Sequence, residues 1–310
     1  MAMSMKEINE KLTDKFVKFL EDGLVDEQWV KPWNFANALP KRYDPKEKAW
    51  VAYSGTNFYF LALESLCMGY EFEEWGTFKQ WKALGRVVRK GQGGTEAFLP
   101  ITVKKKDDDG EEESVFVGFR AYKVFNYAQT DKVEEDGYES KPKERTPGFE
   151  GIKEVDEFFS AVAKNANWGM IDNPGDRAYY SPVNHTIYVP PKGQFTDARY
   201  YSTVAHESIH ATGHESLMNR PFGRQMSSPK YAIEELVAEL GASFVCANLG
   251  IGAELDSQHM AYISSWIKAL KADAAILRKI MRIADHAAKG IFALSKGEDF
   301  EWKTEEKKSD

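Results

Sequence analysis

The pentapeptide His-Glu-Ser-Ile-His at positions 206–210 restricts the fold of this chain more than any other feature. On a helix, positions i and i+4 lie one turn apart on the same face, so His206 and His210 can bind one metal ion. Glu207 then lies to the side, where its carboxylate can act as a general base toward a water molecule. Because the neighbouring residues are apolar, we predict a buried helix with a metal site on one face.

A catalytic zinc site needs a third protein ligand and one open position. Glu235, which follows the histidines on the next predicted helix, is our preferred third ligand. Glu239 lies one turn further on the same face and can accept the free ring N–H of a ligating histidine. Glu234 and Glu239 remain the alternatives to Glu235 as the ligand.

Other histidines compete for a place in this site. His214 continues the four-residue spacing, but Gly213 is expected to end the helix before it. A longer zinc-binding pattern would require histidine at 216, where the chain has Ser216. His185 and His259 are candidates for stabilising an oxyanion, although lone histidines more often have structural roles.

The expected cofactor is one divalent metal ion, Zn²⁺ first and Mn²⁺ as the alternative. Such a site suits hydrolysis of a peptide bond, with Glu207 moving the proton from water to the leaving amine. We expect the strand at 186–189 to pair with an extended peptide substrate by strand addition. The alternative is a metal that only stabilises its domain.

The 310 residues predict an α+β protein with two domains. We expect a mixed α/β domain at 1–130, a linker at 131–150, a mainly helical metallopeptidase-like domain with a small β-hairpin at 151–295, and a flexible tail at 296–310. Hydrophobic periodicity and capping signals predict helices at 57–69, 154–166, 196–210, 229–248, 257–270 and 274–294, and hairpins at 97–103 with 115–125 and at 178–181 with 186–189.

Charge and aromatic residues are unevenly distributed. The chain has a net charge of -7, yet residues 1–130 carry 19 basic and 20 acidic residues and are nearly neutral. Within them, the window 79–106 holds eight basic residues and Glu96 as its one acidic residue. Positions 1–130 also hold five of the eight tryptophans. Cationic side chains bind phosphates and aromatic rings stack on unpaired bases, which favours single-stranded DNA as the partner. The candidate DNA-binding residues are Trp33, Trp75, Lys79, Trp81, Arg86, Arg89 and Lys90.

The two cysteines, Cys67 and Cys246, are far apart and outside any CxxC motif, which favours a reducing compartment. No apolar run is long enough to span a membrane, and the N-terminus lacks a signal-peptide pattern. We therefore expect a cytoplasmic protein without a membrane partner, whose oligomeric state stays open.

Taken together, these residues resemble the ArdC-type antirestriction proteins of plasmids and phages. The resemblance spans roughly residues 5–290. In the first domain it rests on Pro32-Trp33, Gly55-Thr-Asn57, Trp75-x-Thr77-Phe78-x-Gln80, Gly85-x-Val87-Val88-Arg89-Lys90-Gly91 and Val124-Phe125-Asn126-x-x-Gln129. In the second it rests on Tyr180-Ser-Pro and on the segments 188–192, 205–214 and 231–239. The chain departs from the family at Ala211, where the family has an aromatic residue, and in an acidic insert at 107–113.

The resemblance implies an N-terminal single-stranded-DNA-binding domain followed by a zincin-type metallopeptidase domain. A protein of this kind coats incoming single-stranded DNA in a recipient cell and shields it from restriction endonucleases. Two alternatives remain: a DNA-tethered zinc protease that cleaves DNA-bound proteins, similar in logic to the SprT-like proteases, and a single-stranded-DNA-binding protein with a structural metal.

Overall fold

A computed structural model describes most of the chain as two compact units. The described residues are 5–25, 39–106, 112–140, 153–173, 175, 177–194, 197–222, 228–251 and 260–300. The first unit comprises Met1–Gln28, Asn37–Glu144 and Leu270–Arg278, and the second comprises Trp29–Ala36, Arg145–Ala269 and Lys279–Asp310. The α+β class is confirmed. No helix within the described ranges combines the length and the apolar character that crossing a membrane requires.

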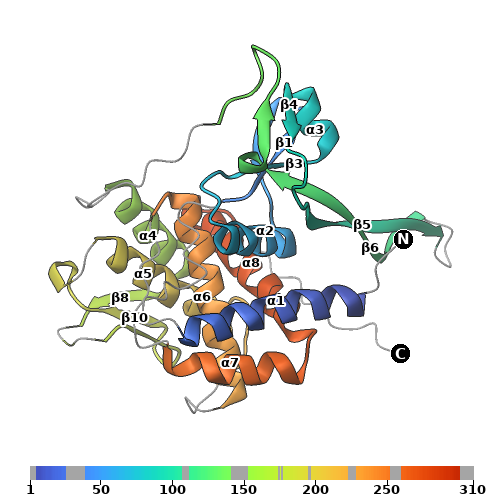
Figure 1. Cartoon of the computed structure of the whole chain (residues 1–310). Helices are drawn as coiled ribbons and strands as arrows, with labels where there is room; N and C mark the ends of the chain where they lie inside the picture. Colours follow the sequence, from blue (N-terminus) through green and yellow to red (C-terminus); the bar gives the residue numbers. More distant parts are fainter. Residues whose placement is uncertain are drawn as a thin grey trace. The chain divides into compact units, whose positions relative to one another are not determined.

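The first unit is built on a five-stranded sheet with the strand order β2-β1-β3-β6-β5 (Figure 1). Its strands are β1 (Lys41–Asp44), β2 (Ala49–Ala52), β3 (Glu74–Gly76), β5 (Thr95–Lys106) and β6 (Glu112–Asn126). Helices α1 (Met5–Val25), α2 (Gly55–Met68) and α3 (Phe78–Ala83) belong to the same unit. The β1–β2 hairpin is a feature that the sequence pattern did not predict.

Apolar spacing explains the helices of this unit. Along α1, residues Ile8, Leu12, Phe16 and Leu20 recur every four positions, and all four are buried. The predicted helix at 57–69 is confirmed as α2, and the predicted strands at 97–103 and 115–125 are confirmed as the antiparallel pair β5–β6. This pair extends as a two-stranded arm (Figure 1), and its register shifts between Ile101 and Thr102.

The first unit continues beyond residue 130, where we expected a linker to begin. Strand β7 (Thr130–Lys132) pairs with β4 (Arg86–Val88), and the chain then returns against Gly85. A Cβ atom at Gly85 would lie 2.7 Å from the Gly137 Cα, so the two segments touch through their backbones. The low apolar content of this stretch gave no sign of its structure, which is held by backbone pairing and by the packing of Tyr138 against the Trp81 cluster.

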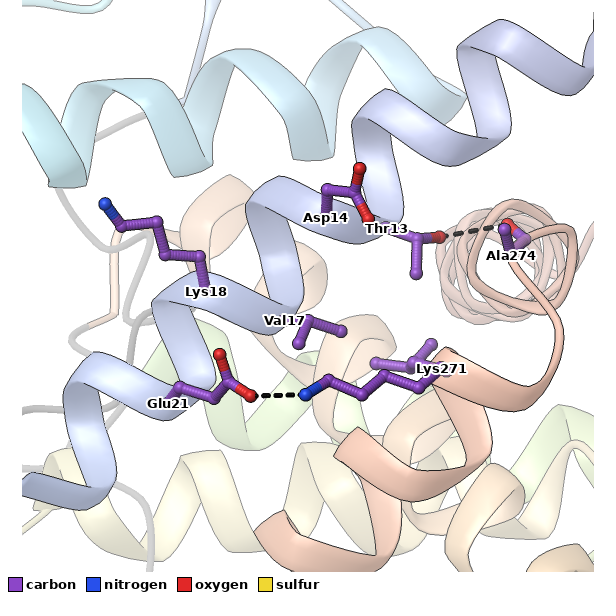
Figure 2. A pocket seen from close by; sticks show the side chains of 8 residues that line it. Thr13, Asp14, Val17, Lys18, Glu21, Lys271 and Ala274 are labelled. Carbon is purple, nitrogen blue, oxygen red and sulfur yellow. Dashed lines mark hydrogen bonds and ion pairs between the residues drawn. The ribbon is translucent and has the colours of Figure 1, made fainter.

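A segment from the C-terminal half of the chain also belongs to the first unit. The Thr13 hydroxyl on α1 donates a hydrogen bond of 2.9 Å to the Ala274 carbonyl, and the Lys271 ammonium lies 2.6 Å from the Glu21 carboxylate (Figure 2). The Arg278 side chain donates a further bond to Asn9 at 3.1 Å. The boundaries expected at 151 and 295 therefore do not enclose a single contiguous unit.

The second unit contains the three-stranded sheet β8-β10-β9 and most of the helices after residue 150. The strands are β8 (Gly169–Asp172), β9 (Tyr179–Ser181) and β10 (Thr186–Val189), and the helices are α4 (Lys153–Ala166), α5 (Asp197–Ala211), α6 (Pro229–Leu249), α7 (Met260–Ala272) and α8 (Ile276–Ser295). These helices match the predicted ones within a few residues. Strand β8 was not predicted.

Strand β10 lies at the centre of this sheet, which corrects our expectation for a peptide substrate. It pairs in parallel with β8 on one side and antiparallel with β9 on the other. Its backbone groups are therefore already bonded, and the strand at 186–189 cannot accept a peptide by strand addition.

Close packing of α5 on α6 is the central contact of the second unit. Helix α6 begins at the predicted N-cap, Ser228, whose hydroxyl accepts a bond from the Tyr231 amide at 3.1 Å. At the crossing point, a Cβ atom added to Gly241 would lie 2.8 Å from the Ile209 Cδ1 atom. Glycine at 241 therefore permits an approach of the two helices that a larger residue would prevent.

We expect Gly241→Val to reduce the free energy of unfolding by about 1–3 kcal/mol, because the added methyl groups overlap the Ile209 side chain. Lys230→Val, at an exposed position of the same helix, is the control for a valine in α6 that overlaps no neighbouring side chain. Chemical denaturation measures both variants. Equal stability of the two would contradict the close packing described above.

Candidate metal centre and nucleic-acid surface

Two neighbouring helices bring the predicted metal ligands together. His206 and His210 lie one turn apart on α5, Glu235 lies on α6, and the structure groups their donor atoms within 4.8 Å of one another. His206 and Glu235 are only 6% and 5% exposed. Glu207 is also buried, on the same helix as the histidines.

The spacing of the donor atoms suits a single small cation. The two Nε2 atoms of His206 and His210 are 3.1 Å apart, and the Glu235 carboxylate oxygens lie 3.6 Å and 3.5 Å from them. Ligand atoms bound about 2.0–2.1 Å from a tetrahedral zinc ion lie roughly 3.3 Å from one another. Two imidazoles and one carboxylate are also the donor set of hydrolytic zinc sites, so the residues present fit one divalent ion.

The opposite ring nitrogens of the two histidines face carboxylates. The Nδ1 atom of His210 lies 3.2 Å from the Glu234 carboxylate, and the Nδ1 atom of His206 lies 3.6 Å from that of Glu239. Such carboxylates orient a ligating imidazole and make it a stronger ligand. Glu239 thus lies beside His206, and Glu234 lies beside His210.

Arg220 is a central residue of this cluster that the sequence analysis missed. Its guanidinium binds both Glu234 carboxylate oxygens, at 2.6 Å and 2.9 Å, and donates to the Ile209 carbonyl at 2.7 Å and the Thr212 hydroxyl at 2.8 Å. Arg220 therefore joins the C-terminal end of α5 to α6. No sequence motif marks Arg220. The three acidic residues in an otherwise apolar helix, however, need buried cationic partners, and this need could have predicted a buried arginine or lysine nearby.

The buried charges shift the pKa values of the cluster. Burial alone would lower the pKa of His210, but hydrogen bonds to Glu234 and Glu235 outweigh it and hold the pKa well above its usual value. Burial would raise the pKa of Glu234, but Arg220 outweighs it and keeps the pKa below its usual value. Burial would also raise the pKa of Glu235, but hydrogen bonds to His206 and His210 outweigh it and lower the pKa, so this residue is ionised, which is the form that binds a metal ion.

The competing histidines lie outside this group. The His214 ring stacks on the His185 ring with their centroids 3.9 Å apart, and its Nδ1 atom bonds to the Ser216 hydroxyl at 2.8 Å. The Tyr180 hydroxyl and the His185 Nδ1 atom are 2.8 Å apart. His259 lies outside the described residues.

In the first unit, two of the predicted base-stacking residues are core residues. Trp75 and Trp81 are both 0% exposed, and the Trp81 indole donates a hydrogen bond of 2.9 Å to the Phe125 carbonyl. Because a base needs an exposed ring face, the prediction that these two tryptophans stack on DNA is wrong. Trp33 lies outside the described residues.

Arg86 is likewise buried and does not face a phosphate. Its guanidinium donates to the Thr130 hydroxyl at 2.7 Å and to the Tyr138 carbonyl at 2.9 Å, and it lies 4.0 Å from the centre of the Tyr127 ring. These contacts satisfy its charge inside the unit, which corrects the prediction that Arg86 binds DNA.

The other basic candidates lie at the surface. The Arg89 side chain is 41% exposed and lies 3.1 Å from the Asp131 carboxylate. Lys79 and Lys90 are exposed, as is Lys82 from the same predicted basic window. Within the described parts of the chain, these three lysines form no ion pair. With Arg86 buried, the basic surface is therefore smaller than predicted, and these three lysines are part of it.

Comparisons with known proteins match both units. Residues 6–125 match the family described as the N-terminal domain of anti-restriction factor ArdC, and residues 153–286 match the family described as zincin-like metallopeptidase. The metal-free crystal structure of the antirestriction protein ArdC from plasmid R388 is similar with a TM-score of 0.74 and 31% identity, covering 94% of this chain and 98% of that chain. The Mn(II)-bound structure of the same protein gives a TM-score of 0.71 and 30% identity, covering 93% of this chain and 97% of that chain.

Two further relatives differ in how much of their length is matched. Protein y4eC of Sinorhizobium fredii is 30% identical over 292 residues, which cover 90% of this chain and 91% of that protein. The DNA primase TraC of Escherichia coli is 31% identical over 288 residues, which cover 88% of this chain but only 26% of the primase. The chain thus spans about a quarter of the primase.

We expect Arg220→Met to lower the free energy of unfolding by about 3–5 kcal/mol, because it leaves the Glu234 carboxylate buried without its cation. Arg177→Met, at an exposed position of the same unit, is the matched control and should change stability by less than about 0.5 kcal/mol. Adding Glu234→Gln to Arg220→Met should recover part of the loss. Denaturant titration measures all three proteins, and a full-stability Arg220→Met protein would contradict the role of this ion pair.

Proposed function

The chain belongs to the family of the ArdC antirestriction proteins, and from this premise we propose that it binds single-stranded DNA through its first unit and protects incoming plasmid or phage DNA from restriction endonucleases. The observation that carries the proposal is the set of exposed lysines at 79, 82 and 90 within the segment that matches the ArdC N-terminal domain. Exposed cations of this kind attract phosphates.

In the second unit, His206, His210 and Glu235 would hold one divalent ion, with Zn²⁺ as the first candidate and Mn²⁺ as the alternative. When bound, such an ion polarises a substrate carbonyl and makes a water molecule more acidic. Glu207 would accept the proton from that water on its carboxylate and pass it to the leaving amine. Glu234 and Glu239 would fix the imidazole orientations through the Nδ1 atoms that they face.

A second candidate function is a DNA-tethered metallopeptidase that cleaves proteins bound to DNA. It is favoured by Glu207, because a metal that only stabilised the fold would need no buried general base beside its ligands. The charge of Glu207 acts on both histidines and contributes to their raised pKa values. The two functions are compatible in one chain, and different variants separate them.

For the metal site, we expect Glu235→Gln to remove the bound ion, since an amide oxygen is a much weaker ligand than a carboxylate. Glu234→Gln should instead keep one ion per chain and bind it roughly 10–100-fold more weakly, because Glu234 orients His210 and is not itself a ligand. Metal content after gel filtration and the shift in melting temperature on adding Zn²⁺ or Mn²⁺ measure both effects. If Glu235→Gln retained a full equivalent of metal, Glu235 would not be a ligand.

For the DNA site, we expect the triple variant Lys79/Lys82/Lys90→Ala to bind single-stranded DNA more weakly and to reduce the salt slope of log K by about 2. Lys164/Lys230/Lys268→Ala removes the same charge from exposed positions of the second unit and is the matched control. Protection from a restriction endonuclease should fall with DNA affinity, whereas Glu207→Gln should leave protection intact. Loss of protection in Glu207→Gln would favour the metallopeptidase as the primary function, and a wild-type protein that does not bind single strands would refute the proposal.

A further inference from the structure

Phe78 is far more exposed than the large aromatic residues next to it in sequence. It is 58% exposed, whereas Trp75 and Trp81 on either side of it are fully buried. Of the described phenylalanine and tryptophan side chains in the first unit, it is the most exposed. The Phe78 side chain is therefore accessible to a ligand, whereas the Trp75 and Trp81 side chains are not.

The position of Phe78 is determined by the start of α3. Thr77 and Gln80 form a capping box, in which the side-chain Oε1 atom of Gln80 accepts a bond of 2.8 Å from the Thr77 amide. Phe78 is the first residue of the helix, and its ring meets the Phe125 ring edge-on with centroids 4.5 Å apart. A capping box accepts many residue types at this position, so the local structure does not explain a phenylalanine here.

A glycine-containing loop approaches the same aromatic pair. A Cβ atom at Gly94 would lie 2.8 Å from the Phe125 ring, so only glycine lets the backbone pass over this ring. Gln129, which is 2% exposed, holds the loop by donating a bond of 2.8 Å to the Gly93 carbonyl. Gly91 has a φ of +87°, which requires glycine, and the space where its Cβ would lie is open. The loop is therefore anchored and has an accessible backbone.

Lysines lie on the helix and the loop that carry this feature. Lys79 and Lys82 lie on the same short helix as Phe78, and Lys90 begins the loop. Lys123 lies beside Gly94, where its Cβ atom is 3.1 Å from the position of an added Cβ, and its ammonium lies 3.6 Å from the Glu96 carboxylate. An aromatic ring among cations suits a nucleotide, whose base stacks on the ring while its phosphate attracts the lysines.

We propose that Phe78 is a base-stacking platform for single-stranded DNA and that the loop at 90–94 binds the neighbouring phosphate. This inference rests on the proposed DNA-binding function and identifies its base contact. Single strands suit the platform because the bases of a duplex are already stacked and do not offer a free face. The platform takes over the stacking role that the buried Trp75 and Trp81 cannot perform.

We expect Phe78→Ala in the full-length protein to weaken binding of a fluorescent single-stranded oligonucleotide by about tenfold or more. Its salt slope should remain that of the wild type, because stacking releases no counterions, whereas Lys90→Ala should reduce the slope. An oligonucleotide of the same length with abasic sites should bind Phe78→Ala and the wild type equally. Phe78→Trp should retain affinity, since it keeps an aromatic face.

Leu99→Ala, which truncates another exposed apolar side chain of the first unit, is the matched control and should bind like the wild type. Phe78→Leu keeps apolar contact with Phe125 but lacks an aromatic face, so it should also bind weakly, even if Phe78→Ala proves unstable. Wild-type affinity in a folded Phe78→Ala or Phe78→Leu protein would overturn the platform while leaving DNA binding itself intact. A wild-type protein without single-strand affinity would instead refute the proposed function on which this inference rests.

Discussion

Burial of three carboxylates on one helix is the constraint on which the second unit depends. Glu234, Glu235 and Glu239 are 6%, 5% and 0% exposed on α6. Carboxylates can be buried at this depth only when cations or hydrogen-bond donors compensate them. The compensating groups come from the two histidines of α5 and from Arg220, so α5 and α6 must pack closely, and the glycine at the crossing point allows them to do so.

The first unit uses a buried cation in a different way. Arg86 bonds to Thr130 and Tyr138 and lies over the Tyr127 ring, so it links β4 to the segment that follows the main sheet. Trp81 fixes α3 to β6 through its bond to the Phe125 carbonyl. Arg86 and Trp81, which we predicted to bind DNA from their residue types, are therefore structural residues. Their contacts fix the backbone that carries the exposed lysines and Phe78.

Local spacing allowed the metal group and most helices to be predicted. His206 and His210 share a helix face whatever surrounds them, and Ser228 caps α6 through residues next to it in sequence. The roles of Glu234 and Arg220 could not be predicted in the same way, because 14 positions separate the partners and no periodic pattern relates them. Strand β8 and the return of the chain after residue 130 depend on backbone pairing with segments further away in the sequence, which side-chain patterns do not report.

The burial pattern of strand β4 explains why Arg86 was wrongly predicted to bind DNA from its residue type. Its burial alternates, with Arg86 and Val88 inside and Val87 45% exposed, although hydrophobicity would place valine inside and arginine outside. Alternate residues of a strand share a face, so burial of Val88 against Trp81 and Phe125 places Arg86 on the inner face as well. The arginine tolerates that face because its donors and its planar charge have partners there. In this unit, the two-residue period of the strand therefore places Arg86 inside and removes it from the basic side chains at the surface.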